Sequence, residues 1–176
     1  MRQLLNGITG VLLLISFSAA TLAGWDPKNV DEAQAAIAAF KATDPDLELF
    51  FDKAHGYAVF PSIGKAGMGI GGAYGTGVVY EKGKEIGATS LKQLSMGFEF
   101  GGENFREIIF FQDEKTLNDF KEGNYELGAQ ASAVALKKGA SKKTDFNDGV
   151  AVFTQTKGGL MFDVSVGGQK FTFEPK

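Results

Sequence analysis

The stretch that decides the fold is residues 67–80, which read Gly-Met-Gly-Ile-Gly-Gly-Ala-Tyr-Gly-Thr-Gly-Val-Val-Tyr. Glycine or alanine occupies every odd position from 67 to 77, whereas Met68, Ile70 and Tyr74 occupy even positions. Successive side chains of a strand point to opposite faces, so one face of this strand is almost bare. Glycines weaken a strand interior unless another element packs closely or the strand bends. The pattern therefore predicts a tightly curved sheet or a small barrel.

Other segments predict strands and helices around this stretch. Two helices come first: one opens with a capping box of Asn29 and Glu32, and one has Asp44 as N-cap, Pro45 in the first turn and Gly56 after its end. Asp113 caps a short third helix. Apolar or alternating runs predict strands at 96–100, 107–112, 129–136, 150–156, 160–166 and 170–173, the last two joined by a hairpin at 167–168.

These elements predict an α+β fold class: two N-terminal helices packed on a curved, mostly antiparallel β-sheet or small barrel, with one further short helix. The chain has 176 residues, of which 44% are hydrophobic and 22% charged, as expected for a single globular domain. It contains no cysteine and one histidine, which excludes disulfides, thiolate metal sites, cysteine nucleophiles and multi-histidine metal sites. The net charge of −3 gives no support for nucleic-acid binding.

Residues 1–23 are typical of a secretory signal peptide. Arg2 supplies a positive start, residues 11–17 a short apolar run, and Thr21-Leu-Ala23 a cleavage site of small residues. We therefore expect a single mature domain over residues 24–176. An exported chain without cysteine is expected in the periplasm or cell envelope of a bacterium.

Three patterns that resemble catalytic motifs lack the context that their chemistry needs. Residues 67–72 match the dinucleotide-binding pattern G-x-G-x-x-G, but strand rather than helix follows them. Residues 62–65 match S-x-x-K without the S-D-N and K-T-G partners of penicillin-binding enzymes. His55 lies at a predicted helix end, where a cation is favourable and where a structural role is commoner than a catalytic one. The sequence therefore predicts no enzyme, no cofactor and no metal site.

A cluster of lysines is the positive chemical signal. Lys137, Lys138, Lys142 and Lys143 fall within seven positions, and no acid occurs from 127 to 144. A solvated loop is the simplest interpretation, and an anionic lipid surface is the functional one. At about 1 kcal/mol per lysine, four lysines contribute roughly 4 kcal/mol, equivalent to a Kd of about 1 mM. An apolar contribution is therefore needed, and Trp25, Phe50 and Phe51 are its candidate sources.

Several segments are similar to those of SYLF-domain proteins. They read Gly-Tyr-Ala-Val-Phe-Pro at 56–61, Gly-Gly-Ala-Tyr-Gly at 71–75, Gly-Phe-Glu-Phe-Gly-Gly at 97–102 and Lys-Gly-Gly-Leu-Met at 157–161. The resemblance covers residues 30–174. It implies a lipid-binding domain, since eukaryotic members bind phosphoinositides and regulate actin, whereas bacterial members are exported proteins of poorly defined role.

Two hypotheses follow. The first is non-enzymatic binding of anionic phospholipid or a membrane surface by an exported envelope protein, with the four lysines as contacts. The second is a structural or protein-interaction module of the envelope without direct lipid binding, in which the glycine-faced strand packs against a protein partner or against itself. A predicted signal peptide replaces the amphipathic N-terminal helix of the eukaryotic members, so the general lipid function carries over better than their particular ligand.

Overall fold

The computed structural model describes residues 26–122, 126–127 and 133–176. The element order begins with helix α1 (Pro27–Thr43), the 3-10 turn η1 (Pro45–Leu47) and helix α2 (Glu48–Lys53). Strands β1 (Gly56–Glu81) and β2 (Lys84–Phe111), helix α3 (Glu114–Lys121) and the short strands β3 (Glu126–Leu127) and β4 (Val134–Ala135) follow. The turn η2 (Ser141–Lys143) and strand β5 (Val150–Pro175) complete the chain. The predicted α+β class is confirmed.

The helix boundaries correct two predictions. The N-cap of α1 is Asp26, whose side chain accepts a hydrogen bond from the Lys28 amide at 2.9 Å, so the helix begins before the predicted capping box at Asn29. The sequence signal is the same Asp-Pro pair that was correctly assigned at Asp44, where η1 begins. Gly56 does not end the second helix, because it is already the first residue of β1.

Three long antiparallel strands form most of the sheet, whose order is β1-β2-β5-β3, with β4 added to β5 in parallel. The separate strands predicted at 96–100 and 107–112 are parts of β2, and those predicted from 150 to 173 are parts of β5. The hairpin predicted at Gly167-Gly168 is wrong: both glycines pair in register with Ser95 and Leu94 of β2. Half of the strand predicted at 129–136 lies outside the described residues, and the described half contains the two-residue strand β4.

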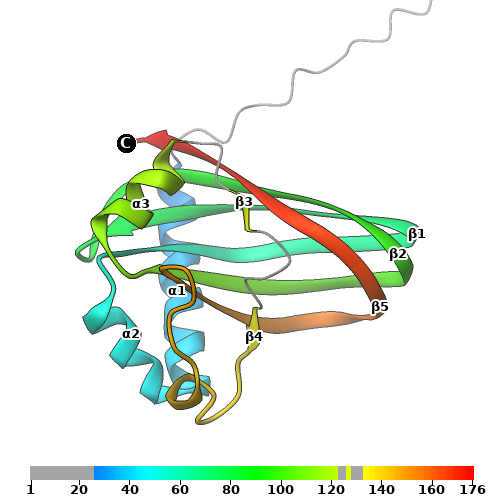
Figure 1. The fold of residues 1–176 in the computed structure, drawn as a ribbon, viewed down its shortest axis with the longest axis horizontal. Coiled ribbons are helices and arrows are strands. Elements are labelled where there is room, and N and C mark those ends of the chain that lie inside the picture. The colour runs from blue at the N-terminus through cyan, green and yellow to red at the C-terminus, as the bar shows by residue number, and fades with distance from the viewer. Residues whose placement is uncertain (1–25, 123–125, 128–132) are drawn as a thin grey trace, which may run out of the picture.

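The sheet folds back on itself. A straight strand of 26 residues would be about 85 Å long, with its ends far apart. Instead, the rings of Tyr57 and Tyr80 stack with centroids 4.9 Å apart, and the Lys82 amide donates to the His55 carbonyl at 3.0 Å. β1, β2 and β5 all turn back at the same end of the molecule (Figure 1). The predicted curvature is therefore confirmed, and it arises within strands rather than between them.

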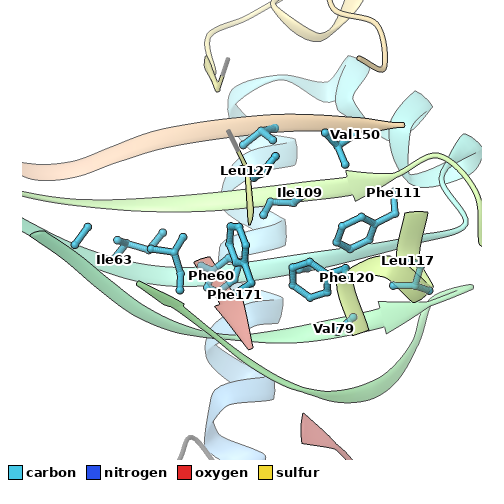
Figure 2. Packing of buried hydrophobic residues seen from close by; sticks show 14 of the residues in the cluster. Phe60, Ile63, Val79, Ile109, Phe111, Leu117, Phe120, Leu127, Val150 and Phe171 are labelled. Carbon is cyan, nitrogen blue, oxygen red and sulfur yellow. The ribbon is translucent and has the colours of Figure 1, made fainter. Parts of the chain in front are cut away.

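The folded sheet holds one core inside it and a second core under the helices. Phe60, Phe111, Phe120 and Phe171 point toward one another between the strands in Figure 2, with centroid distances of 4.8 to 5.7 Å between neighbouring rings. The second cluster joins α1 and α2 to the other face of the sheet, with Phe50 in contact with Phe110, Phe146 and Phe153. Both cores lie away from the end where the strands turn back.

Candidate functional site: an apolar tip on the folded sheet

Large apolar side chains are exposed where β1 and β2 turn back. Five of them have between 64% and 79% of their surface accessible, and we call this set the apolar tip: Met68, Ile70, Leu94, Met96 and Phe100. A single exposed apolar residue is ordinary on a protein surface, whereas a contiguous group marks an interaction site. The apolar tip is therefore the first candidate for the functional site.

The strand register places these side chains on one face. Met68 pairs with Phe100, and Ile70 pairs with Met96. Directly opposed residues in an antiparallel pair point to the same side, with their Cβ atoms about 5 Å apart. Tyr74 pairs with Lys92 on the same face, and both are exposed. A phenol and an ammonium therefore border the apolar tip on the side nearer the body of the protein.

A shallow hollow of about 630 Å³ lies beside the apolar tip. Five glycines line it together with Tyr74, and they come from all three long strands: Gly64, Gly72, Gly102, Gly158 and Gly159. A Cβ built on Gly64 or Gly158 meets no atom within 4 Å. Gly64 and Gly158 therefore leave open space in the hollow, whereas a Cβ on Gly159 would overlap the Gly102 carbonyl oxygen, so this glycine permits close packing of β5 on β2.

The four lysines predicted as lipid contacts lie elsewhere. Lys137, Lys138, Lys142 and Lys143 are all exposed on the loop between β4 and β5, which we call the lysine loop (137–143). Figure 1 shows this loop below α1 and α2, well away from the end where the strands turn back. The cationic cluster and the apolar tip are therefore separate surfaces and two different candidate contacts with a membrane.

A buried carboxylate anchors the lysine loop to the helices. Asp44 is fully buried, and one of its oxygens accepts from both the amide and the hydroxyl of Ser141, at 2.9 and 2.7 Å. Burial alone raises the pKa of Asp44, but the hydrogen bonds from Ser141, Gly139 and Asp46 outweigh it and lower the pKa. Asp44 thus serves as the N-cap that was predicted and as a tertiary anchor that the sequence did not reveal.

One lysine of the loop already has a partner. Lys142 forms an ion pair with Asp46 at 3.1 Å, so part of the loop's charge is offset. The aromatic residues considered as apolar contacts do not assist the loop, because Phe50 is buried and Phe51 packs edge-on against Tyr57 and Phe110. Trp25 lies outside the described residues. Of the candidates that the structure describes, neither Phe50 nor Phe51 therefore supplies the apolar contribution expected beside the lysines.

The three motif-like patterns occupy strand and loop positions. Residues 62–65 and 67–72 both lie within β1. His55 is in contact with Glu81, with its Nε2 2.9 Å from Oε1, and this hydrogen bond lowers the pKa of Glu81. Among the described residues, no group of three metal-ligating side chains is placed to hold an ion. None of the described helices is both long and apolar enough to span a membrane.

The apolar tip was not predicted from the sequence, although its apolar residues alternate along both strands. The even positions 68, 70 and 74 were recognised as one face of a strand, and Leu94, Met96 and Phe100 alternate in the same way. Alternation identifies a face but does not say whether it is buried, and Val78 and Tyr80 of the same pattern are indeed buried. The place where β1 turns back determines which part of this face the helices cover and which part stays exposed.

Comparison with known proteins supports the resemblance noted in the sequence. Residues 92–176 match the family model described as Ysc84, Las17-binding protein actin regulator. The chain is 30% identical over 156 residues to beta cell expansion factor A of Aeromonas veronii, an alignment that covers 83% of this chain and 59% of that relative. The chain thus spans about three fifths of the length of the curated relative it matches. Residues 92–176 therefore match the Ysc84 family, and the resemblance to SYLF-domain proteins that the sequence predicted is confirmed.

Proposed function

We propose that this protein binds lipid membranes without enzymatic chemistry, by inserting its apolar tip into the surface of an anionic bilayer. The observation that carries the proposal is the exposure of Met68, Ile70, Leu94, Met96 and Phe100 on one face of the paired strands β1 and β2. Following the predicted signal peptide, we place this activity at the cell envelope of a bacterium.

The energies favour the apolar tip over the lysine loop as the main contact. Burying a large apolar side chain contributes about 1.5 to 3 kcal/mol, so five side chains that start about two-thirds exposed contribute roughly 5 to 10 kcal/mol before ordering costs. The lysine loop contributes at most roughly 4 kcal/mol, and Lys142 is already paired. Insertion therefore dominates, and cationic groups adjust the preference for anionic lipid.

The border of the apolar tip fits an interface between hydrocarbon and water. Tyr74 and Lys92 oppose each other next to Leu94, on the side toward the body of the protein. Tyrosine is enriched at membrane interfaces, and lysine extends its ammonium toward the headgroups while its alkyl stem stays in apolar surroundings. This arrangement sets the depth of insertion at the level of residues 74 and 92.

Flotation with liposomes tests the proposal. We expect the variant Leu94→Ser/Phe100→Ser to lose most of its binding to vesicles that contain phosphatidylglycerol. Leu49→Ser is the matched control, since Leu49 is an exposed leucine on α2 outside the apolar tip, and it should bind as the wild type does. Near-ultraviolet circular dichroism confirms that the variants are folded.

Salt and the lysine loop separate the two contributions. We expect binding to persist in part at about 0.5 M salt, because insertion is not screened as charge pairing is. Replacing Lys137, Lys138 and Lys143 by glutamine should reduce binding less than the serine variant of the apolar tip. Complete release by salt, or equal binding by the serine variant and the wild type, would contradict insertion and favour the lysine loop as the contact. Absence of vesicle binding by the wild type would favour the protein-interaction module.

A further inference from the structure

A second, polar hollow lies on the helix-covered side of the sheet. It has a volume of about 380 Å³, and its walls include Glu32 of α1, Pro61 and Ser62 of β1, Arg106 of β2 and Lys157 of β5. Arg106 is the only arginine after residue 2. Ser62 lies six residues before Met68, about 20 Å away along an extended strand, so this hollow is distinct from the apolar tip.

Both neighbours of β2 have a pairing irregularity close to Arg106: β1 directly opposite it, and β5 beside it, between Asn104 and Phe105. On β1, the pairing passes from Phe60–Glu107 to Ile63–Phe105, which leaves Pro61 and Ser62 opposite Arg106 alone. On β5, an irregularity between Asn104 and Phe105 makes Lys157 the extra residue. Bulges re-aim side chains and are frequent beside functional sites. Two of them flank this arginine.

The irregular pairing brings a second cation to the arginine. Lys157 extends from β5 across β2, and its ammonium donates to the Pro61 carbonyl of β1 at 3.2 Å. The ammonium therefore lies over the strand that carries Arg106, on the wall of the same hollow. Glu32 is the one acid among the described residues of this wall, its side chain is half exposed, and it forms an ion pair with Lys28 at 3.9 Å. The hollow has a net positive charge.

Arg106 has an unused donor inside the protein. Its Nε is buried and has no hydrogen-bond partner among the described residues. A buried donor without a partner is costly, and the cost is recovered when an acceptor reaches it. The hydroxyl of Ser62 donates to the side-chain Oδ1 of Asn104 at 2.8 Å, so the cationic side chains of Arg106 and Lys157 are the remaining donor side chains among the described residues on the wall of the hollow.

We infer that this hollow binds a phosphate group. Arg106 holds the phosphate through bidentate hydrogen bonds, and Lys157 supplies a second positive charge. The planar guanidinium presents parallel N–H donors that match phosphate oxygens, and a phosphomonoester carries nearly two negative charges for the two cations. The volume leaves space for a small body attached to the phosphate. This inference does not depend on insertion of the apolar tip.

Isothermal titration calorimetry of the full chain measures its affinity for inorganic phosphate and for glycerol 3-phosphate, and so tests this site. We expect the affinity to fall at least tenfold in Arg106→Met and in Lys157→Met. Arg106→Lys should bind more weakly than the wild type, because an ammonium keeps the charge but loses the two-pronged geometry. Lys143→Met, which removes a lysine of the lysine loop, should bind phosphate within twofold of the wild type.

A parallel binding measurement with phosphatidic acid vesicles distinguishes a free phosphate from a lipid headgroup as the ligand. Dependence on Arg106 that appears only with phosphatidic acid vesicles would support the same phosphate chemistry with a lipid as its source. No binding to inorganic phosphate, to glycerol 3-phosphate or to the phosphatidic acid vesicles would overturn the inference, as would equal binding by Arg106→Met and the wild type. Leu94→Ser/Phe100→Ser should keep its phosphate affinity, so failure of membrane insertion and failure of the phosphate site give different results.

Discussion

The paired strands β1 and β2 have similar residue types at two places with different surroundings: a packed end near the helices and the apolar tip where the strands turn back. At the packed end, residues 56–63 of β1 lie against residues 75–81, and the side chains of Ile63 and Val79 are fully buried. At the apolar tip, Met68 and Ile70 of the same strand are largely exposed. One amphipathic pattern therefore makes a core at one end and an interaction surface at the other.

Glycine also has different roles at the two ends. A Cβ on Gly75 would come within 2.7 Å of the Ile63 side chain and 2.9 Å of the Ser62 carbonyl, and a Cβ on Gly77 would overlap the Val59 carbonyl. At Gly64 nothing lies within 4 Å, and Gly69 meets no neighbour but has a φ of +78°, which disfavours any side chain. The glycines of β1 are thus closely packed at one end of the strand and open at the other.

The largest expected effect comes from removing one phenylalanine at each end. Phe171→Ala should lower the free energy of unfolding by about 3 to 5 kcal/mol, because the ring is buried against Phe60 and Phe120 and its loss leaves a cavity. Phe100→Ala should change it by less than about 0.5 kcal/mol. Urea unfolding measures both. Similar losses would show that the apolar tip is part of the core.

Glycine replacements come next. Gly77→Val should destabilise the protein by about 3 kcal/mol, at the upper end of overpacking, because the Val59 carbonyl it meets belongs to the backbone and cannot rotate away. Gly64→Val should be neutral or slightly stabilising, since a β-branched residue suits an extended strand with open space. Thermal unfolding of the pair is the measurement, and equal losses would remove the distinction between the two ends.

A buried acid at the packed end should make stability depend on pH. Glu107 is fully buried, with one oxygen accepting from Gln169 at 3.1 Å and the other without a partner. Burial raises its pKa to about 7. The unfolded state therefore releases its proton first, and stability should fall by about 3 kcal/mol as pH rises from about 4.5 to 7.

Glu107→Gln should remove this loss and leave the protein more stable than the wild type at pH 8, with little difference at pH 4. Glu103→Gln, on the same strand beside the glycine-lined hollow, is the control and should keep the pH dependence of the wild type. Parallel pH profiles for Glu107→Gln and the wild type would mean that this carboxyl does not titrate within the fold.

The smallest effect concerns the attachment of the lysine loop to the packed end. Asp44→Asn should cost about 1 to 2 kcal/mol, because an amide cannot accept both hydrogen bonds from Ser141 with one oxygen while capping η1. The pKa of Asp44 is lowered, so its contribution is present above about pH 4 and is lost as pH falls through the folded-state value. Denaturant curves at pH 7 and pH 2.5 should show the difference shrinking.

Much of the local structure was predictable because its causes are local. The Asp-Pro pair at Asp44 and the cap at Asp113 act through hydrogen bonds to nearby backbone amides, as seen at Thr116. The strands were found as periodic segments, but their continuity was not. Gly167 and Gly168 read as a turn, yet they remain paired with β2 because a neighbouring strand supplies partners for their backbone.

Sequence by itself determined the class of the protein, the curvature of its sheet, its family resemblance and the absence of cysteine chemistry. Tertiary structure alone decided which part of an alternating face is covered, where the four lysines lie relative to it, and that Arg106 and Lys157 share a hollow. The physical reason is that burial and convergence depend on contacts between residues far apart in the chain. Period-two alternation determines only which face of the sheet a side chain is on. The place where β1 turns back determines whether another part of the protein covers that face.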